Sequence, residues 1–160
     1  MRIGILAVGK LKAGPERELV ARYIDRFAKT GPAIGLELGK LAEFSESRAG
    51  STEARKREEA SMLEKAVPDG AAIVALDERG KAIDSQDFAD YVGTLRDQGR
   101  RDMVFVIGGA DGLDPDLRER ADLVLNLGRL TWPHQLARIL IAEQLYRCVT
   151  ILSGHPYHRA

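Results

Sequence analysis

Short apolar runs alternate along the chain with stretches in which apolar residues recur every three or four positions. The runs are apolar almost throughout, which is typical of strands buried on both faces of a parallel sheet. They lie at 3–8, 72–76, 103–107 and 123–127. The helical stretches lie at 16–29, after a capping Ser85, and at about 133–152. This alternation predicts an α/β fold with a mostly parallel sheet and helices on both faces.

Weaker patterns complete the expected order of elements. Apolar residues alternate with glycine and glutamate over 34–38, and this period of two predicts a further strand. The segment 43–57 is rich in Ser, Glu, Arg and Lys and is expected to begin as a loop, with Ser51 or Thr52 capping the helix that follows. Asp114, which is followed by a proline, is typical of the start of a short helix.

The last predicted helix, 133–152, is apolar around most of its circumference. A helix that is apolar on nearly all sides must be buried on nearly all sides. In a domain of this size one face can pack on the sheet, so we expect the other face to meet a second copy of the chain in a homodimer.

Three polar or reactive positions on this helix have simple structural interpretations. Cys148 is interpreted as a small buried apolar residue, and Glu143 with Arg147 as an ion pair one helical turn apart. For Arg138 the spacing leaves two roles open, a structural one and contact with a phosphate.

The composition indicates a single globular domain over residues 1–160. Hydrophobic residues make up 44% of the chain and charged residues 30%, and the 24 basic side chains balance the 24 acidic ones. A protein that binds nucleic acid through a general basic surface would have an excess of positive charge, so the charge balance at first argues against RNA as well as DNA, and no DNA partner is expected. One cysteine excludes an internal disulfide and favours the cytoplasm. No apolar run is long enough for a signal segment or a membrane span, so no membrane partner is expected.

Three strand exits are the places where chemistry is expected, because ligands of open parallel sheets bind beyond the carboxyl ends of the strands. The exits are 76–80, 108–112 and 128–134, and each contains glycine, which lets a flat heterocycle such as adenine approach the backbone. The chain has neither a dinucleotide fingerprint nor a phosphate-binding P-loop. The glycine cluster alone therefore fits a ligand loop and an ordinary tight turn equally well.

All three histidines, His134, His155 and His158, lie near the C-terminus. Metal binding is not expected, because no Cys, Asp or Glu accompanies the two histidines of the tail. A tail of this kind is commonly a frayed end. Here, however, it joins Tyr157, His158 and Arg159, which can stack on a base, exchange protons and pair with anions.

A set of ordered motifs spans nearly the whole chain. They are ILAVGKLK near the N-terminus, VFVIGGADGL, LTWPHQLAR, EQLYR and the terminal HPYHR. Together they resemble the ribosomal RNA large subunit methyltransferase H family. This resemblance implies a SPOUT-class enzyme that uses S-adenosylmethionine to methylate N3 of a pseudouridine in helix 69 of 23S rRNA, within the large subunit or the 70S ribosome. It also implies a homodimer and a deep trefoil knot in the C-terminal half.

The resemblance also assigns site residues by position. Tyr157 and His158 would position or deprotonate the base, and Arg159 would stabilise negative charge on its carbonyl oxygens or hold the RNA backbone. No metal is implied. The implied cofactor contacts fall on the three strand exits: Leu76, Gly108, Leu127, Gly128, Arg129, Leu130, Thr131 and Trp132.

Two other functions share parts of this pattern. A flavodoxin-like nucleotide-binding module would show the same α/β alternation, and a non-catalytic ribosome-binding factor could keep the tail and the dimer. The distribution of charge favours an RNA substrate, because the segment 129–160 has four arginines against one glutamate, together with all three histidines. The balanced total therefore does not exclude RNA, and it suggests recognition of one structured target through a small basic site.

Overall fold

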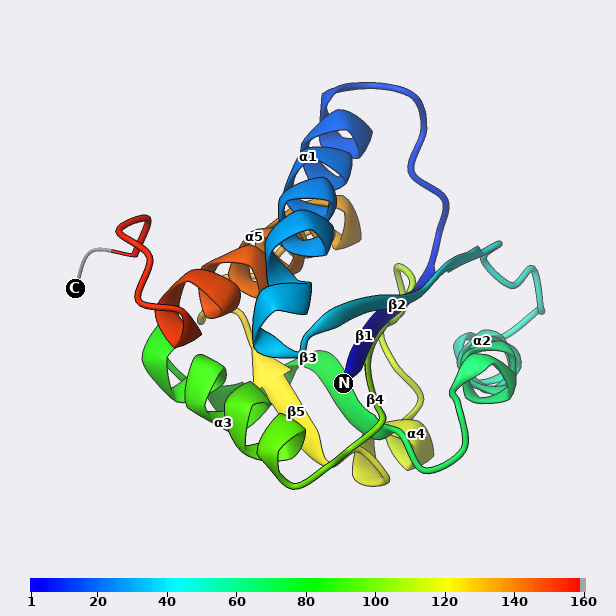
Figure 1. The fold of residues 1–160 in the computed structure, drawn as a ribbon. Coiled ribbons are helices and arrows are strands. Elements are labelled where there is room, and N and C mark those ends of the chain that lie inside the picture. The colour runs from blue at the N-terminus through cyan, green and yellow to red at the C-terminus, as the bar shows by residue number, and fades with distance from the viewer. Residues whose placement is uncertain (159–160) are drawn as a thin grey trace.

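The computed structural model describes residues 1–158, so Arg159 of the predicted tail lies outside the described residues. Five strands form one sheet in which every pairing is parallel, in the order β2-β1-β4-β3-β5 (Figure 1). The strands are β1 (Arg2–Val8), β2 (Glu37–Phe44), β3 (Ala72–Ala82), β4 (Asp102–Ile107) and β5 (Leu123–Asn126). The predicted α/β class with a parallel sheet is confirmed.

Helices cover both faces of the sheet, as the alternation of elements predicts. The helices are α1 (Pro15–Thr30), α2 (Thr52–Ala66), α3 (Ser85–Asp97), α4 (Pro115–Glu119) and α5 (His134–Leu152). Successive side chains of a strand point to opposite faces, and those of β1 divide accordingly. Ile5 packs in a core with α1, α3 and α5, whereas Leu6 packs in a second core with α2 and α4.

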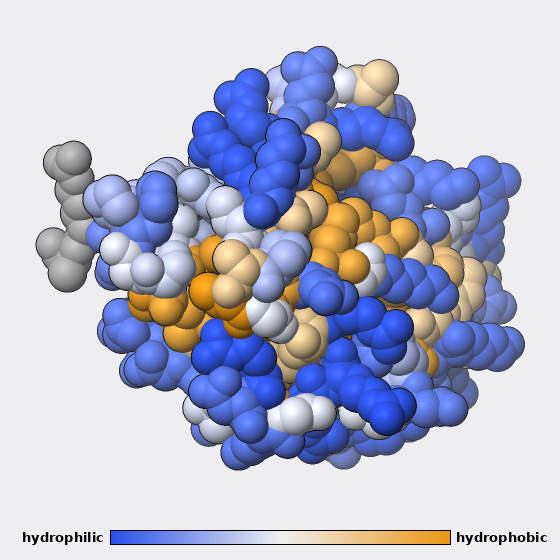
Figure 2. All heavy atoms as spheres, in the orientation of Figure 1, coloured by the Kyte–Doolittle hydropathy of each residue, from blue (hydrophilic) through white to orange (hydrophobic). Residues whose placement is uncertain are grey.

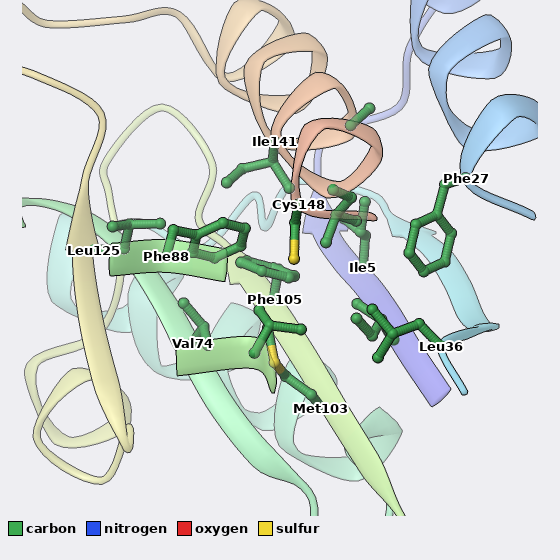
Figure 3. Packing of buried hydrophobic residues seen from close by; sticks show 14 of the residues in the cluster. Ile5, Phe27, Leu36, Val74, Phe88, Met103, Phe105, Leu125, Ile141 and Cys148 are labelled. Carbon is green, nitrogen blue, oxygen red and sulfur yellow. The ribbon is translucent and has the colours of Figure 1, made fainter. Parts of the chain in front are cut away.

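The larger core lies beneath α5 (Figure 3). Phe105 of β4 meets Phe88 of α3 in a tilted aromatic pair with 6.0 Å between ring centroids. Cys148 points into the same core and is 1% exposed, which confirms its interpretation as a small apolar residue. Burial raises the pKa of its thiol to about 12, so the thiol is protonated and inert at neutral pH.

The second strand predicted at 34–38 is present, but its bounds are wrong. A short 3₁₀ turn, η1 (Gly31–Ile34), occupies its first position, and Gly35 ends that turn with a φ of 76°. This left-handed conformation breaks an extended chain. The second strand begins only at Glu37 and runs to Phe44, beyond residue 43, where a loop is expected. It is an edge strand with a mostly exposed pattern, so its sequence lacks the apolar signal of the central strands.

The helix starts are close to those predicted. The side chain of Ser51 accepts a hydrogen bond from the Ala54 amide at 3.1 Å, and Asp114 caps α4 in the same way. At α3 the cap is Asp84, one residue before the predicted Ser85, because the Asp84 carboxylate accepts from the Asp87 amide at 2.8 Å. Ser85 is instead the first helical residue.

Strand β3 differs from the prediction in a way that shapes the site. Its pairing with β4 ends at Leu76, as expected. The chain then returns to β5, so that Leu76 and Lys81 both pair with Leu125. Residues 77–80 therefore form a wide bulge at the carboxyl end of the sheet.

The packing of α5 accounts for most of its apolar circumference within one chain. The helix lies between α1 and α3 and against the sheet (Figure 1). On the face shown in Figure 2, hydrophobic residues reach the surface beside and below α1, whereas the upper part of α1 is covered by hydrophilic residues. The large apolar side chains left most exposed near α5 lie around its start, where Leu130 is 72% exposed, Trp132 41% and Leu136 39%. Among the described residues no helix has the length and apolar character needed to span a bilayer.

Candidate functional site

A cavity of about 640 Å³ opens where strands β3, β4 and β5 end. Its walls come from the bulge after Leu76, the glycine turn after Ile107 and the loop between β5 and α5. These are the three strand exits in which chemistry is predicted. The volume lies within the range of about 300–1,000 Å³ that small-molecule sites occupy.

Seven of the eight residues expected to contact a cofactor line this cavity. They are Leu76, Gly108, Leu127, Gly128, Leu130, Thr131 and Trp132. Arg129 is exposed on the same loop and is not part of the lining. Residues that were selected only by their positions in the sequence thus surround one cavity in the fold.

The turn after β4 depends on the absence of side chains. A Cβ atom on Gly108 would lie 2.7 Å from the carbonyl carbon of Gly112, which is too close for any real contact. The amide of Gly112 donates to the carbonyl of Gly109 at 3.0 Å, and Gly112 itself has a φ of 84°. This tight turn leaves the backbone open towards the cavity, next to the apolar side chains of Ile107 and Leu113.

Asn126 fixes two walls of the cavity to each other. Its Nδ2 donates to the carbonyl of Glu78 in the bulge at 2.6 Å, and its Oδ1 accepts from the Gly128 amide at 2.6 Å. The indole Nε1 of Trp132 donates to the Leu127 carbonyl at 3.1 Å and closes the same loop. Sequence reasoning missed Asn126, although an asparagine two residues before a glycine is a common turn signal.

Carboxylates give the cavity an acidic component. Asp77 pairs with Arg118 at 3.3 Å, and Asp111 pairs with Arg55 at 2.6 Å. The hydrogen bond from Arg55 lowers the pKa of Asp111, so this carboxylate is charged at neutral pH. Neither ion pair could be found from sequence spacing, because the partners are far apart in the chain.

Arg138 has a structural role, which answers the question that its spacing left open. The residue is 3% exposed. Its guanidinium donates to the Glu43 carboxylate at 2.5 Å, to the Val8 carbonyl at 3.2 Å and to the Gly9 carbonyl. Arg138 thereby ties the start of α5 to the ends of β1 and β2.

His134, the first residue of α5, also lines the cavity. Burial lowers the pKa of its imidazole, and the positive charge of Arg138 lowers it further. The ring is therefore neutral at pH 7.

The tail folds onto the side of α5. The hydroxyl of Tyr157 donates to Oε1 of Glu143 at 3.1 Å, and the guanidinium of Arg147 lies 5.2 Å from the centre of the Tyr157 ring. The predicted ion pair between Glu143 and Arg147 is present. Burial raises the pKa of Tyr157 to about 12, and Tyr23 and Glu143 raise it in the same direction. Neither Tyr157 nor His158 lines the cavity of its own chain.

Comparison with known families identifies the chain. Residues 1–158 match the family model described as "Predicted SPOUT methyltransferase". The chain belongs to the SPOUT methyltransferase family.

Relatives of this SPOUT methyltransferase match over its whole length. A protein of Allorhizobium ampelinum is 71% identical and one of Rhizobium meliloti is 70% identical, and in both comparisons all 160 residues and all of the relative are covered. Both relatives are named "Ribosomal RNA large subunit methyltransferase H". The resemblance drawn from the ordered motifs is confirmed.

Two solved structures are similar to the fold of this SPOUT methyltransferase. A probable methylase family protein from Haemophilus influenzae has a TM-score of 0.59 at 14% identity, covering 99% of this chain and 70% of the other. A probable methyltransferase from Bordetella pertussis has a TM-score of 0.58 at 16% identity, covering 92% and 95%. At such low identity these likenesses concern the fold alone.

Proposed function

We propose that this protein transfers a methyl group from S-adenosylmethionine to RNA of the large ribosomal subunit. The observation that carries the proposal is the 71% identity, over the full length of both chains, to a protein named for this activity. The cavity at the strand exits supplies the place for the methyl donor.

The target is N3 of a pseudouridine in helix 69 of 23S rRNA, within the large subunit or the 70S ribosome in the cytoplasm. The motif resemblance supports this finer assignment, together with the excess of arginine over glutamate in the segment 129–160. One structured RNA target also suits a chain whose net charge is zero, because such a chain does not bind RNA indiscriminately.

The lining of the cavity fits S-adenosylmethionine. Apolar side chains such as Leu76 and Leu125 suit the flat adenine ring, and the backbone turns at Gly108 and Gly128 offer unobstructed N–H and C=O groups. When bound, the cofactor would supply an electrophilic methyl group on a sulfonium centre.

We propose that the tail binds the RNA base and prepares it for methyl transfer. Methyl transfer needs the N3 atom aligned with the methyl group and freed of its proton. Tyr157 and His158 position the base or take up that proton, and Arg159 stabilises the charge on its carbonyl oxygens. The raised pKa of Tyr157 suits a positioning donor better than a base, because the phenol keeps its proton at neutral pH.

Two copies of the chain are proposed to form each complete site in a homodimer. The described tail residues lie on α5, outside the cavity of their own chain. Leu130 and Trp132, which line that cavity, and the nearby Leu136 expose apolar surface. A second copy placed on this surface would cover it and could bring its own tail to the cofactor.

The chain is further proposed to be a single SPOUT domain over residues 1–160 with a trefoil knot in its C-terminal half. The path of the chain after β5 supports the knot. From this edge strand it passes the exits of β3 and β4 and reaches the end of β1, where Arg138 bonds to the carbonyls of Val8 and Gly9.

One set of assays tests the proposed function. The protein is incubated with S-adenosylmethionine tritiated in its methyl group and with ribosomes from cells that lack this protein, with free 23S rRNA, or with ribosomes that carry uridine at the target. We expect label in the large-subunit RNA of the first sample, mapped to helix 69 by digestion and mass spectrometry. Cofactor binding without transfer would indicate a non-catalytic ribosome-binding factor. Calorimetric binding of FMN instead of S-adenosylmethionine would indicate a flavodoxin-like module.

A further inference from the structure

His134 brings an imidazole into the wall of the cavity from the first turn of α5. The ring packs on the backbone of Gly9, because a Cβ atom there would lie 2.7 Å from the ring atom Cε1. Gly9 has a φ of 88° and thus leaves the space that the imidazole fills. The ring is held between the end of β1 and the cavity.

Two buried polar atoms near this ring lack partners among residues 1–158. They are Nδ1 of His134 and Nε of Arg138. The two residues are four positions apart on α5 and therefore lie on one face of the helix, one turn apart. A guanidinium has only donors and is always protonated. Because Nδ1 of His134 is buried with no acceptor beside it, an N–H at this atom would be left unsatisfied. The proton of a neutral ring therefore belongs on Nε2, which is not among the buried atoms that lack a partner.

We infer that His134 is a neutral hydrogen-bond donor of the site, and that its Nε2–H is directed to a carbonyl oxygen of the target pyrimidine. The inference rests on the proposed function. During transfer the bond between sulfur and methyl breaks, the bond between N3 and methyl forms, and the N3 proton leaves to the base or solvent. Loss of the N3 proton places negative charge on N3 and on the carbonyl oxygens beside it until the methyl group bonds to N3, and a fixed neutral donor stabilises this charge. His134 keeps its proton throughout.

The surroundings of the ring support this assignment. An unprotonated Nε2 beside a methyl donor would itself be a nucleophile, and the proton on Nε2 prevents this. The loop after Gly9 exposes Lys10 and Lys12, which suits the phosphates of an RNA substrate. Arg138 lowers the pKa of the ring, whereas Glu43 and Glu46 oppose this, and burial is the largest effect. The ring is thus neutral when methyl transfer takes place.

The tautomer can be observed without any turnover. The protein is labelled with ¹⁵N-histidine, and the ring nitrogens of its three histidines are observed by NMR at pH 7.5, with His134→Gln identifying the signals of His134. We expect His134 to carry its proton on Nε2. A proton on Nδ1, or a charged ring, would overturn the inference, whatever the outcome for methyl transfer.

Kinetics test the role of the donor. With cofactor saturating, we expect His134→Ala to lower kcat by about 100-fold, as for the loss of one donor to a developing charge, and to change the Kd for S-adenosylmethionine by less than about twofold. Glutamine places an amide N–H near the position of Nε2, so His134→Gln should recover at least about tenfold of the loss. Gln135→Ala, on the same turn but outside the lining, is the matched control, and thermal melting checks the fold of each variant.

Two results would overturn the role. Rescue by glutamine that is no better than by alanine would show that the donor is not used. A loss of cofactor affinity by the alanine variant in proportion to its loss of activity would place the donor on the cofactor. A wild-type protein without methyl transfer would contradict the proposed function itself, and the NMR result would still decide the tautomer.

Discussion

The hydroxyl of Tyr157 donates a hydrogen bond to Oε1 of Glu143 at 3.1 Å, so the tail folds back on the helix from which it emerges. Arg147 pairs with the same carboxylate and covers the Tyr157 ring. Tyr146 packs against this ring as well, with 4.7 Å between centroids. The tail is therefore held on α5 by specific contacts, and it lies outside the cavity of its own chain.

Deletion of residues 157–160 should abolish methyl transfer and leave cofactor binding largely intact. The deleted residues are proposed to act on the RNA base, whereas the cavity is built from other segments. Transfer to ribosomes and calorimetric binding of S-adenosylmethionine measure the two properties. Full activity of the truncated protein would refute the assignment of the tail.

A mixed dimer should recover activity if each site is composite. One chain lacks residues 157–160, and the other carries Gly108→Ala in the cofactor turn. At a cofactor concentration too low to fill the Gly108→Ala cavity, each homodimer is inactive, but the mixed dimer contains one intact cavity that the intact tail of the other chain can reach. Differently tagged chains are co-expressed, purified on both tags and assayed on ribosomes. Continued inactivity of the mixed dimer would indicate that the tail acts within its own chain.

The fold could be predicted largely because the central strands are buried on both faces. The strand predicted at 103–107 lacks only Asp102, the first residue of β4, because every other residue of β4 is apolar. The edge strand β2 could not be placed, because a strand with one exposed face and a left-handed glycine before it has no continuous apolar signal. The pattern of apolar residues along a strand indicates how much of that strand is buried, and the strand at the edge of the sheet is the least buried.

The site could be predicted where glycines mark it, but not where distant side chains pair. The three strand exits follow from the rule for parallel sheets. The bonds from Asn126 to the bulge and from Arg138 to Glu43 join segments far apart in the chain. The apolar circumference of α5 also has a different explanation from the one expected, because α1, α3 and the sheet cover most of it.

Gly108→Ala should weaken cofactor binding by about tenfold or more. The added methyl group would meet the backbone of Gly112 at 2.7 Å, so the turn that lines the cavity must shift. Overpacking of this kind also costs about 1–3 kcal/mol of stability. Gly50→Ala is the control, because no atom lies within 4 Å of its added methyl group. Calorimetry with S-adenosylmethionine measures the effect, and equal affinities of the two variants would contradict the role of the turn.

Arg138→Ala should lower the free energy of unfolding by about 1–3 kcal/mol, the usual cost of leaving a buried polar group without its hydrogen-bond partner. The substitution removes the hydrogen bonds that Arg138 donates to the carbonyls of Val8 and Gly9, and it removes the main partner of Glu43. Arg22→Ala, on the exposed side of α1, should change stability by less than about 0.5 kcal/mol. Urea unfolding measures both variants. A loss of less than about 1 kcal/mol for Arg138→Ala would be incompatible with the buried network.

The stability of the protein should decrease below pH 6.5 in a way that depends on His134. Burial and Arg138 lower the pKa of the ring in the folded protein, whereas the unfolded chain keeps the ordinary value of about 6.5. As the pH falls through 6.5, the unfolded chain therefore binds a proton before the folded protein does, and the equilibrium moves towards unfolding. The contribution of His134 to stability is fully present above about pH 6.5 and is lost as the pH falls through the pKa of the folded protein.

Urea midpoints between pH 7.5 and 5 measure the change. Carboxylates such as Glu59, whose pKa is raised by burial, also titrate in the folded protein. The difference between wild type and His134→Gln isolates the contribution of the histidine. Parallel curves for the two proteins would mean that His134 titrates as it does in the unfolded chain.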